Sequence, residues 1–276
     1  SADVERLMQP PIPLGQRNWL DYRARYLDAP RVQAGVGFWQ RHDRSLARAQ
    51  DDYGVPAGII VAIFGVETFY GRVTGNFRTL DALATLSFDY LRRADYYRGE
   101  LAEFLLLARE QRADPASFRG SFAGALGLPQ FMPSSIRRWA VDFDGDGRID
   151  LLASPADAIG SVANFLVAHG WQRDLPIAHA VEASADIVDR LGRGIRAETP
   201  WRQALAEGVR GDAMLTLDTP VIVIDLPLVN ADGSPGREYR AGTANFSALL
   251  HYNRSYFYAA AVMDLAAVLR EHMPGM

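Results

Sequence analysis

A run of apolar residues between Pro56 and Tyr70 constrains the fold more than any other feature of the sequence. Its largest apolar side chains fall on every side of a helix: Ile59, Ile60, Val61, Ile63, Phe64 and Val66. A helix that is apolar all round is buried, so other helices must surround it. Gly54 fits the end of a preceding helix, and Pro56 fits the first turn of this one. We therefore expect a mainly helical protein built around this segment.

One carboxylate, Glu67, lies inside the apolar run. Burying an ionised carboxylate costs free energy unless the group is paired or protonated. In one interpretation Glu67 ends the helix and faces solvent or an arginine such as Arg72. In the other, apolar surroundings raise its pKa, which suits a general acid near neutral pH. The apolar helix around Glu67 favours the second interpretation.

The composition is that of a globular protein. The chain has 276 residues, of which 49% are hydrophobic and 22% charged, so it can bury a sizeable core. A net charge of −4 argues against sequence-independent nucleic-acid binding. The absence of cysteine excludes disulfides and thiolate metal or redox sites. No apolar run is long enough to span a bilayer, and the first residues do not form a signal peptide.

The hydrophobic pattern changes along the chain and predicts the fold class α+β, mainly α. Residues 1–54 read as helices, and residues 55–175 contain the apolar helix and further amphipathic helices. Residues 176–242 include a β-branched stretch with Asp232-Gly233 at a hairpin turn. Residues 243–276 return to helix. The segment "SFAGALGLPQFMPSS" is apolar but rich in glycine and proline, so it reads as a closely packed turn.

The stretch "DFDGDGRID" matches the start of an EF-hand calcium loop. Alternate oxygen ligands on a tight loop suit a hard cation. The twelfth position, where a glutamate is expected, is Ala153, and Asp157 is the carboxylate that can close a longer loop. Asp157 also lies three residues after Ser154, where it supports a helix N-cap. The alternative is a solvated Asp/Gly turn without an ion. The candidate ligands are Asp142, Asp144, Asp146, Arg148 through its carbonyl, Asp150 and Asp157.

Aromatic and amide side chains gather in a few segments and suit the lining of a sugar cleft, although each also suits a packed core. They are Tyr96, Tyr97, Phe122, Phe131, Tyr252, Asn253, Tyr256 and Tyr258.

Several motifs occur in an order that resembles one family. They are "VETFYGRVTGNF", "SFAGALGLPQFMPSS", "DFDGDGRID", "DAIGSVANFLVAHGW" and "HYNRSYFY". Together they resemble the membrane-bound lytic transglycosylase B family of bacterial peptidoglycan enzymes and its soluble relatives. The resemblance is continuous from about Pro56 to Trp171 and resumes at Asn245–Tyr258.

The resemblance implies a lysozyme-like catalytic core over 55–175, with its EF-hand-like loop at 142–157. It also implies an N-terminal helical domain over 1–54, an accessory segment with a small β domain over 176–242, and a C-terminal segment over 243–276 that returns to the core. It makes Glu67 the catalytic acid and base. The cleft residues it implies are Ser121, Gln130, Arg93, Tyr96, Phe122, Tyr252, Asn253 and Tyr258.

The implied reaction cleaves the MurNAc–GlcNAc β-1,4 bond and forms a 1,6-anhydromuramoyl end without water. Ordinary glycosidases need two carboxylates. No second carboxylate in the sequence is a comparable candidate for the site, since Asp81 and Asp89 read as helix-cap or surface residues. An attack by the substrate's own C6 hydroxyl removes that need. Ser121 and Tyr252 are hypothesised to position the acetamido group.

The resemblance also implies no cofactor for catalysis and a structural calcium ion, or sodium, in the loop. The expected partners are peptidoglycan glycan strands and, as a further option, cell-wall synthesis enzymes. The expected location is the periplasm, either soluble or anchored to the outer membrane through a removed N-terminal lipid signal. Three alternatives stay open: a hydrolytic muramidase, a non-catalytic peptidoglycan-binding or scaffold protein, and a calcium-regulated interaction protein.

Overall fold

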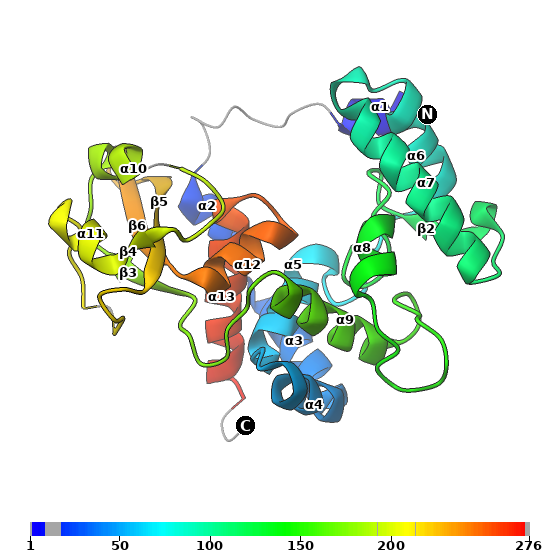
Figure 1. Cartoon of the computed structure of the whole chain (residues 1–276), viewed down its shortest axis with the longest axis horizontal. Coiled ribbons are helices and arrows are strands. Elements are labelled where there is room, and N and C mark those ends of the chain that lie inside the picture. Colours follow the sequence, from blue (N-terminus) through cyan, green and yellow to red (C-terminus); the bar gives the residue numbers. More distant parts are fainter. Residues whose placement is uncertain (1, 9–17, 192, 213, 274–276) are drawn as a thin grey trace.

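The computed structural model describes residues 2–8, 18–191, 193–212 and 214–273. Helices predominate (Figure 1). The N-terminal half contains α1 (Ala2–Leu7), α2 (Trp19–Ala24), α3 (Ala29–Arg41), α4 (Asp43–Tyr53), α5 (Ala57–Thr68), α6 (Thr79–Phe88), α7 (Ala94–Glu110) and α8 (Pro133–Trp139). The C-terminal half contains α9 (Pro155–Ala168), α10 (Ala185–Leu191), α11 (Trp201–Ala206), α12 (Ala244–Tyr252) and α13 (Tyr256–Glu271).

Helix α5 is the apolar run of the sequence, and it lies at the centre of the core. It packs against α3, α4, α9 and α13 (Figure 1), and every residue from Ala57 to Gly65 is buried. Gly65 lets α13 approach closely, because a Cβ there would lie 2.9 Å from a side-chain atom of Leu265. The prediction of a mainly helical protein around this segment is confirmed.

The β part is an antiparallel sheet with the strand order β3-β6-β5-β4. Its strands are β3 (Ala178–Val181), β4 (Thr199–Pro200), β5 (Pro220–Val229) and β6 (Pro235–Gly242). The long strands β5 and β6 form a hairpin, and Gly233 takes a φ of 82° in its turn, as the Asp232-Gly233 pair predicted. Residues of α10 and α11 cover this sheet with a second, smaller core that includes Val188, Trp201 and Val223.

A third part of the molecule holds α6, α7 and α8, together with the two-stranded sheet β1 (Phe77–Arg78) and β2 (Arg119–Gly120). It lies on the other side of the α5 core from the β part (Figure 1). Helix α1 packs on α6, whereas α2 packs on β5 and α13. The helices before residue 54 therefore contact three different parts of the fold, and the division of the chain into domains stays a prediction.

A buried ion-pair network joins α2, β6 and α13. The Asp264 carboxylate of α13 accepts hydrogen bonds from Arg23 Nε at 2.6 Å and from Arg240 Nη1 at 2.8 Å. The side chain of Arg240 is only 6% exposed. Within the described ranges, no helix is both long and apolar enough to cross a membrane.

Candidate active site

Glu67 lies in the last turn of α5 and is held by a tyrosine from the other end of the chain. Tyr258, in the first turn of α13, donates a hydrogen bond from its hydroxyl to Glu67 Oε1 at 2.7 Å. Tyr258 is 2% exposed. Arg72 does not pair with Glu67: its guanidinium lies 4.6 Å from the Phe69 ring centroid, and no ion pair to Glu67 occurs among the described residues. The interpretation of Glu67 as an ion-paired helix end is not supported.

The surroundings of Glu67 tune its acidity. Part of its surface stays accessible, but protein atoms surround the carboxyl closely, and this desolvation raises its pKa to about 7. The Tyr258 hydrogen bond acts in the opposite direction because it stabilises the ionised form. Burial also raises the pKa of Tyr252 and Tyr258 well above the usual value. Near neutral pH the carboxyl can therefore both give and take a proton, while both phenols remain hydrogen-bond donors.

The backbone turns sharply just after Glu67. Phe69, Tyr70 and Gly71 have φ values of 51°, 58° and 88°, and left-handed conformations are unfavourable for the two aromatic residues. Hydrogen bonds stabilise the turn: the Tyr70 amide donates to Phe64 O at 3.0 Å, and the Thr68 hydroxyl donates to Leu128 O at 3.1 Å. The helix end that carries Glu67 is thereby joined to the loop that follows β2.

That loop places Gln130 beside the helix end. Gln130 has a φ of 52°, and its Nε2 donates to Thr74 O at 3.1 Å and to Gly127 O at 3.0 Å. Gly127 has a φ of 72°, and a Cβ there would lie 2.4 Å from Leu151 O, so the close turn requires glycine. The prediction of a closely packed turn in this segment is confirmed.

Tyr252 connects this loop to the partner of Glu67. Its hydroxyl donates to Pro129 O at 2.6 Å. Its ring stacks against the Tyr258 ring with centroids 6.2 Å apart and planes 15° apart. Tyr252 thus lies between the Gln130 turn and the Tyr258 hydroxyl.

Ser121 and Phe122 lie at the end of β2. The Ser121 hydroxyl accepts hydrogen bonds from the amides of Ala123 and Ala125, at 3.3 and 3.0 Å. Phe122 packs edge-on against Phe77 of β1. Ser121 therefore stabilises the turn after β2, and its role toward a substrate stays a prediction.

A hollow of about 950 Å³ continues from this centre. Of the residues singled out in the sequence, six line it: Arg93, Tyr96, Gln130, Phe131, Tyr252 and Asn253. The Arg93 guanidinium lies 4.4 Å from the Tyr96 ring centroid. The lining does not include Glu67, Ser121, Phe122 or Tyr258. Glu67 is connected to it through Tyr258 and Tyr252.

The sequence did not single out several residues that also line the hollow: Glu100, Arg138, Trp139, His169, His251 and Arg254. His251 and Arg254 flank Tyr252 and Asn253 in "HYNR", which is a local signal for those two. Arg138 comes from the end of α8, and no pattern in the sequence relates it to the site. His169 comes from the end of α9 and lies in the motif "DAIGSVANFLVAHGW", but the motif did not single it out as a cleft residue.

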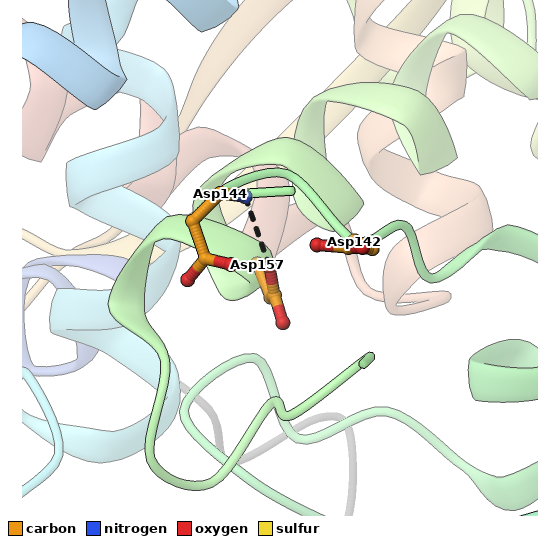
Figure 2. A group of neighbouring side chains, drawn as sticks. All are labelled: Asp142, Asp144 and Asp157. Carbon is orange, nitrogen blue, oxygen red and sulfur yellow. Dashed lines mark hydrogen bonds between the residues drawn. The ribbon is translucent and has the colours of Figure 1, made fainter. Parts of the chain in front are cut away.

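The acidic loop gathers three carboxylates at one point. Single oxygens of Asp142, Asp144 and Asp157 lie within 4.8 Å of one another, and Figure 2 shows them around a common space. Asp157 is 1% exposed, and its two oxygens accept hydrogen bonds from the amides of Phe143 and Asp150, both at 2.8 Å. Its own amide donates to Ser154 Oγ at 3.2 Å, so the predicted N-cap is confirmed.

Asp146 and Asp150 lie outside this close group. Asp146 accepts a hydrogen bond from the Arg148 amide and Asp150 from the Ala153 amide, both at 2.8 Å; Asp142 and Asp144 also accept hydrogen bonds from loop amides. The group itself consists of hard oxygen donors, two from the start of the loop and one from α9. Such a donor set fits a calcium-like cation, and it would fasten the loop to the helix.

Comparison with known proteins gives the family. The model of the transglycosylase SLT domain matches residues 2–267. The membrane-bound lytic murein transglycosylase B of Escherichia coli K12 is 45% identical over 247 residues, which are 90% of this chain. The chain spans 66% of that relative, just under two thirds of its length.

Solved structures agree with this result. The soluble lytic transglycosylase SltB1 of Pseudomonas aeruginosa has a TM-score of 0.89 and 44% identity, covering 99% of this chain and 89% of its own. Escherichia coli Slt35 in complex with calcium has a TM-score of 0.84 and 42% identity, with coverages of 99% and 84%.

Pseudomonas aeruginosa SltB3 in complex with NAG-NAM-pentapeptide has a TM-score of 0.79 and 32% identity, with coverages of 98% and 71%. The family match over nearly the whole chain and these structural likenesses confirm the resemblance found in the motifs. The chain therefore belongs to the transglycosylase SLT domain family, among the lytic murein transglycosylases.

Proposed function

We propose that this chain cleaves the β-1,4 bond between MurNAc and GlcNAc in peptidoglycan and leaves a 1,6-anhydromuramoyl end. The observation that carries the proposal is the Glu67 carboxyl, whose pKa is about 7 and whose only side-chain hydrogen-bond partner in the described chain is Tyr258. The hollow beside it holds one carboxylate, Glu100, whose oxygens are bound by Ser134. A second catalytic carboxylate, which a hydrolytic glycosidase needs, is thus not offered by the described part of the site.

In the proposed reaction, protonated Glu67 gives its proton to the glycosidic oxygen as the C1–O bond breaks. The carbonyl oxygen of the N-acetyl group stabilises the positive charge that develops at C1. The C6 hydroxyl oxygen then bonds to C1, and its proton passes to the ionised Glu67, which restores the starting carboxyl. Because the nucleophile belongs to the same sugar, the second step is intramolecular and favourable.

The neighbours of Glu67 support these steps. The Tyr258 hydroxyl stabilises the carboxylate that exists between the two proton transfers. Tyr252 and Gln130 border the hollow next to it, and we infer that they orient the MurNAc ring. Arg93, Tyr96 and Asn253 line the same hollow and are proposed to contact the glycan. Ser121 and Phe122, directly after β2, are proposed to contact it as well.

We further propose that Asp142, Asp144 and Asp157 hold a structural calcium ion. The calcium complex of Slt35 supports this assignment. An ion there would fasten the loop to α9 and take no part in the chemistry. The substrate lies in the cell wall, so we propose that the chain acts in the periplasm on glycan strands.

The test is a digest of purified murein sacculi by the wild type and by Glu67→Gln, with the soluble products identified by mass spectrometry. The wild type is expected to release anhydromuropeptides, one water lighter than reducing muropeptides. Glu67→Gln is expected to lower their rate of release by at least about a thousandfold, because the proton donor is lost. Glu271→Gln, an exposed change at the end of α13, is the matched control and is expected to behave like the wild type.

Reducing ends in place of anhydro ends would identify a hydrolase and contradict the proposed reaction. Substantial turnover by Glu67→Gln would contradict the role of Glu67. Sacculus binding by the wild type without any product would identify a binding protein.

A further inference from the structure

An arginine from the N-terminal part of the chain binds the helix end that carries Glu67. Arg31, in the first turn of α3, donates a hydrogen bond from Nη1 to Gly65 O at 2.5 Å. In a regular helix the Phe69 amide would bond to Gly65 O, but this amide bonds to Phe64 O instead. The carbonyl of Gly65 is therefore left for the guanidinium, and the positive charge of Arg31 lies at the C-terminal end of α5, where the helix dipole favours it.

The same guanidinium covers the aromatic ring that follows the helix. Its central carbon lies 4.6 Å from the ring centroid of Phe69 and 5.2 Å from that of Tyr26, and a cation over an aromatic face is attracted to it. Asp28 accepts hydrogen bonds from Nε of Arg31 at 3.4 Å and from its amide at 3.0 Å. The side chain of Arg31 is 17% exposed. Arg31 is thus fixed on its own helix while it holds the end of α5.

The turn that Arg31 supports contains a second unfavourable feature besides its left-handed backbone. The Tyr70 hydroxyl is buried and has no hydrogen-bond partner in the described part of the chain. It fits between α3 and α5 because Gly35 and Gly65 have no side chains: a Cβ at these positions would lie 2.4 and 2.6 Å from the hydroxyl oxygen. A buried, unpaired hydroxyl costs free energy. Such a turn persists only where surrounding contacts hold it, and Arg31 supplies two of them.

The environment of Glu67 depends on where this helix end lies. Burial is the larger influence on the pKa of Glu67, and the Tyr258 hydrogen bond is the smaller one. The titratable side chains that interact with the Glu67 carboxyl in the described chain are Tyr252 of α12 and Tyr258 of α13. Both belong to elements other than α5. A loosened end of α5 therefore moves the carboxyl away from them and admits water to it.

We infer that Arg31 is a positioning residue for the catalytic acid: by binding Gly65 O and covering Phe69, it holds the last turn of α5 so that the Glu67 carboxyl meets the Tyr258 hydroxyl. The inference rests on the proposed function, which makes Glu67 the acid. Arg31 is not part of the lining of the hollow, so it acts through Glu67 and not on the glycan. Small displacements of a reacting group are costly, up to about a hundredfold in rate for 1 Å.

The first test is kinetic and uses solubilised glycan strands. Arg31→Met keeps the length of the side chain but removes its charge and its donors. It is expected to lower kcat for anhydromuropeptide release about tenfold to a hundredfold, with KM changed less than about twofold. Arg31→Lys keeps a charge and a donor for Gly65 O and is expected to retain kcat within about threefold of the wild type. Arg31→Gln, a milder change, is assayed beside Arg31→Met so that the test does not depend on one variant folding.

The second test measures the titration of Glu67 directly, by carbon-13 NMR of protein labelled in its glutamate carboxyls, with Glu67→Gln used to assign the signal. In Arg31→Met and Arg31→Gln the midpoint is expected to fall by about half a unit or more, because water reaches the carboxyl.

The matched control for both tests is Arg48→Met. Arg48 makes the same three kinds of contact elsewhere: a hydrogen bond to Phe143 O at 2.7 Å, an ion pair with Asp52 and a position 4.1 Å from the Phe143 ring centroid. Its kcat and its Glu67 midpoint should equal those of the wild type.

An unchanged Glu67 midpoint or an unchanged kcat in the folded Arg31 variants would overturn the inference. A raised KM with kcat preserved would also overturn it, because Arg31 would then act on binding. Equal losses in Arg48→Met would reduce the effect to general destabilisation and overturn it as well. Absence of anhydro products from the wild type would instead overturn the proposed reaction, and the Glu67 midpoint would still decide the role of Arg31.

Discussion

At the scale of single residues, the acidity of Glu67 results from two opposing effects. Burial raises its pKa to about 7, and the hydrogen bond from Tyr258 lowers it. The first step of the proposed reaction needs the protonated carboxyl. The rate is therefore expected to be full below the pKa and to fall as the pH rises through about 7. An ordinary glutamate, with a pKa near 4.5, would already be mostly ionised as the pH approaches 7.

Replacing Tyr258 by phenylalanine tests this balance. Loss of the hydroxyl removes a hydrogen bond to the ionised form, so the pKa of Glu67 is expected to rise by about one unit. The alkaline fall in kcat/KM for muropeptide release should move up by the same amount, and kcat should decrease because the intermediate carboxylate is less stable. The measurement is a pH–rate profile between about pH 5 and 9.

Tyr256→Phe is the matched control for this profile. Tyr256 lies on the same helix, and its hydroxyl binds the backbone of Gly194 instead of Glu67. Its profile should keep the alkaline midpoint of the wild type. An unchanged or lowered midpoint in Tyr258→Phe would contradict the role given to the Tyr258 hydroxyl.

The sequence singled out Glu67 because a lone carboxylate in an apolar helix is a local signal. It could not identify the partner of that carboxylate, since Tyr258 is 191 residues away and was interpreted as a substrate contact. It also could not anticipate the left-handed backbone of Phe69 and Tyr70. Neither residue favours that conformation, which is held by the backbone hydrogen bond from Tyr70 to Phe64 and by the contact of Thr68 with Leu128.

At the scale of elements, the sequence predicted the helix ends that depend on contacts between neighbouring residues. The start of α9 follows from Ser154 and Pro155, and the end of α4 follows from Gly54, which has a φ of 70°. The acidic loop was recognised for the same reason. Its closure was harder to derive, because Asp157 belongs to the next helix and lies beyond the usual loop length. The structure brings it to Asp142 and Asp144.

The loop makes a prediction about calcium. After chelation, added calcium should raise the melting temperature of the wild type by on the order of 5 °C, since an ion that binds only the folded state stabilises it by mass action. Asp142→Asn with Asp144→Asn should abolish this rise, whereas the exposed Asp51→Asn should keep it. The melting temperatures are measured by differential scanning calorimetry with and without calcium. A wild type that does not respond to calcium would contradict the proposed ion.

At the scale of the whole molecule, the site could be predicted only through the family resemblance. The hollow is assembled from α7, α8, α9 and α12, and no periodicity in the sequence indicates which helix faces which. The resemblance supplied Gln130 and Tyr252, which lie in the quoted motifs, and also Arg93, which lies outside them. It did not supply Arg138 or His169, whose positions depend on how the helices pack.

Contacts between residues far apart in the sequence also make Asp264 important for stability. Its carboxylate lies between Arg23 and Arg240 and so connects α2, β6 and the helix that carries Tyr258. Asp264→Asn keeps the shape but leaves the nearly buried Arg240 without full compensation. The free energy of unfolding should decrease by about 3 kcal/mol, since removing one partner of a buried pair leaves an uncompensated charge. Urea unfolding followed by circular dichroism measures this change.

The exposed pair of Arg202 and Asp218 provides the comparison. Their side chains are 62% and 76% exposed, so Asp218→Asn should change the free energy of unfolding by less than about 0.5 kcal/mol. A large difference between the two variants means that burial, and not the number of ion pairs, determines how firmly the β part is attached to α13. Equal effects of the two substitutions would show that the Asp264 network adds no more than a surface pair does.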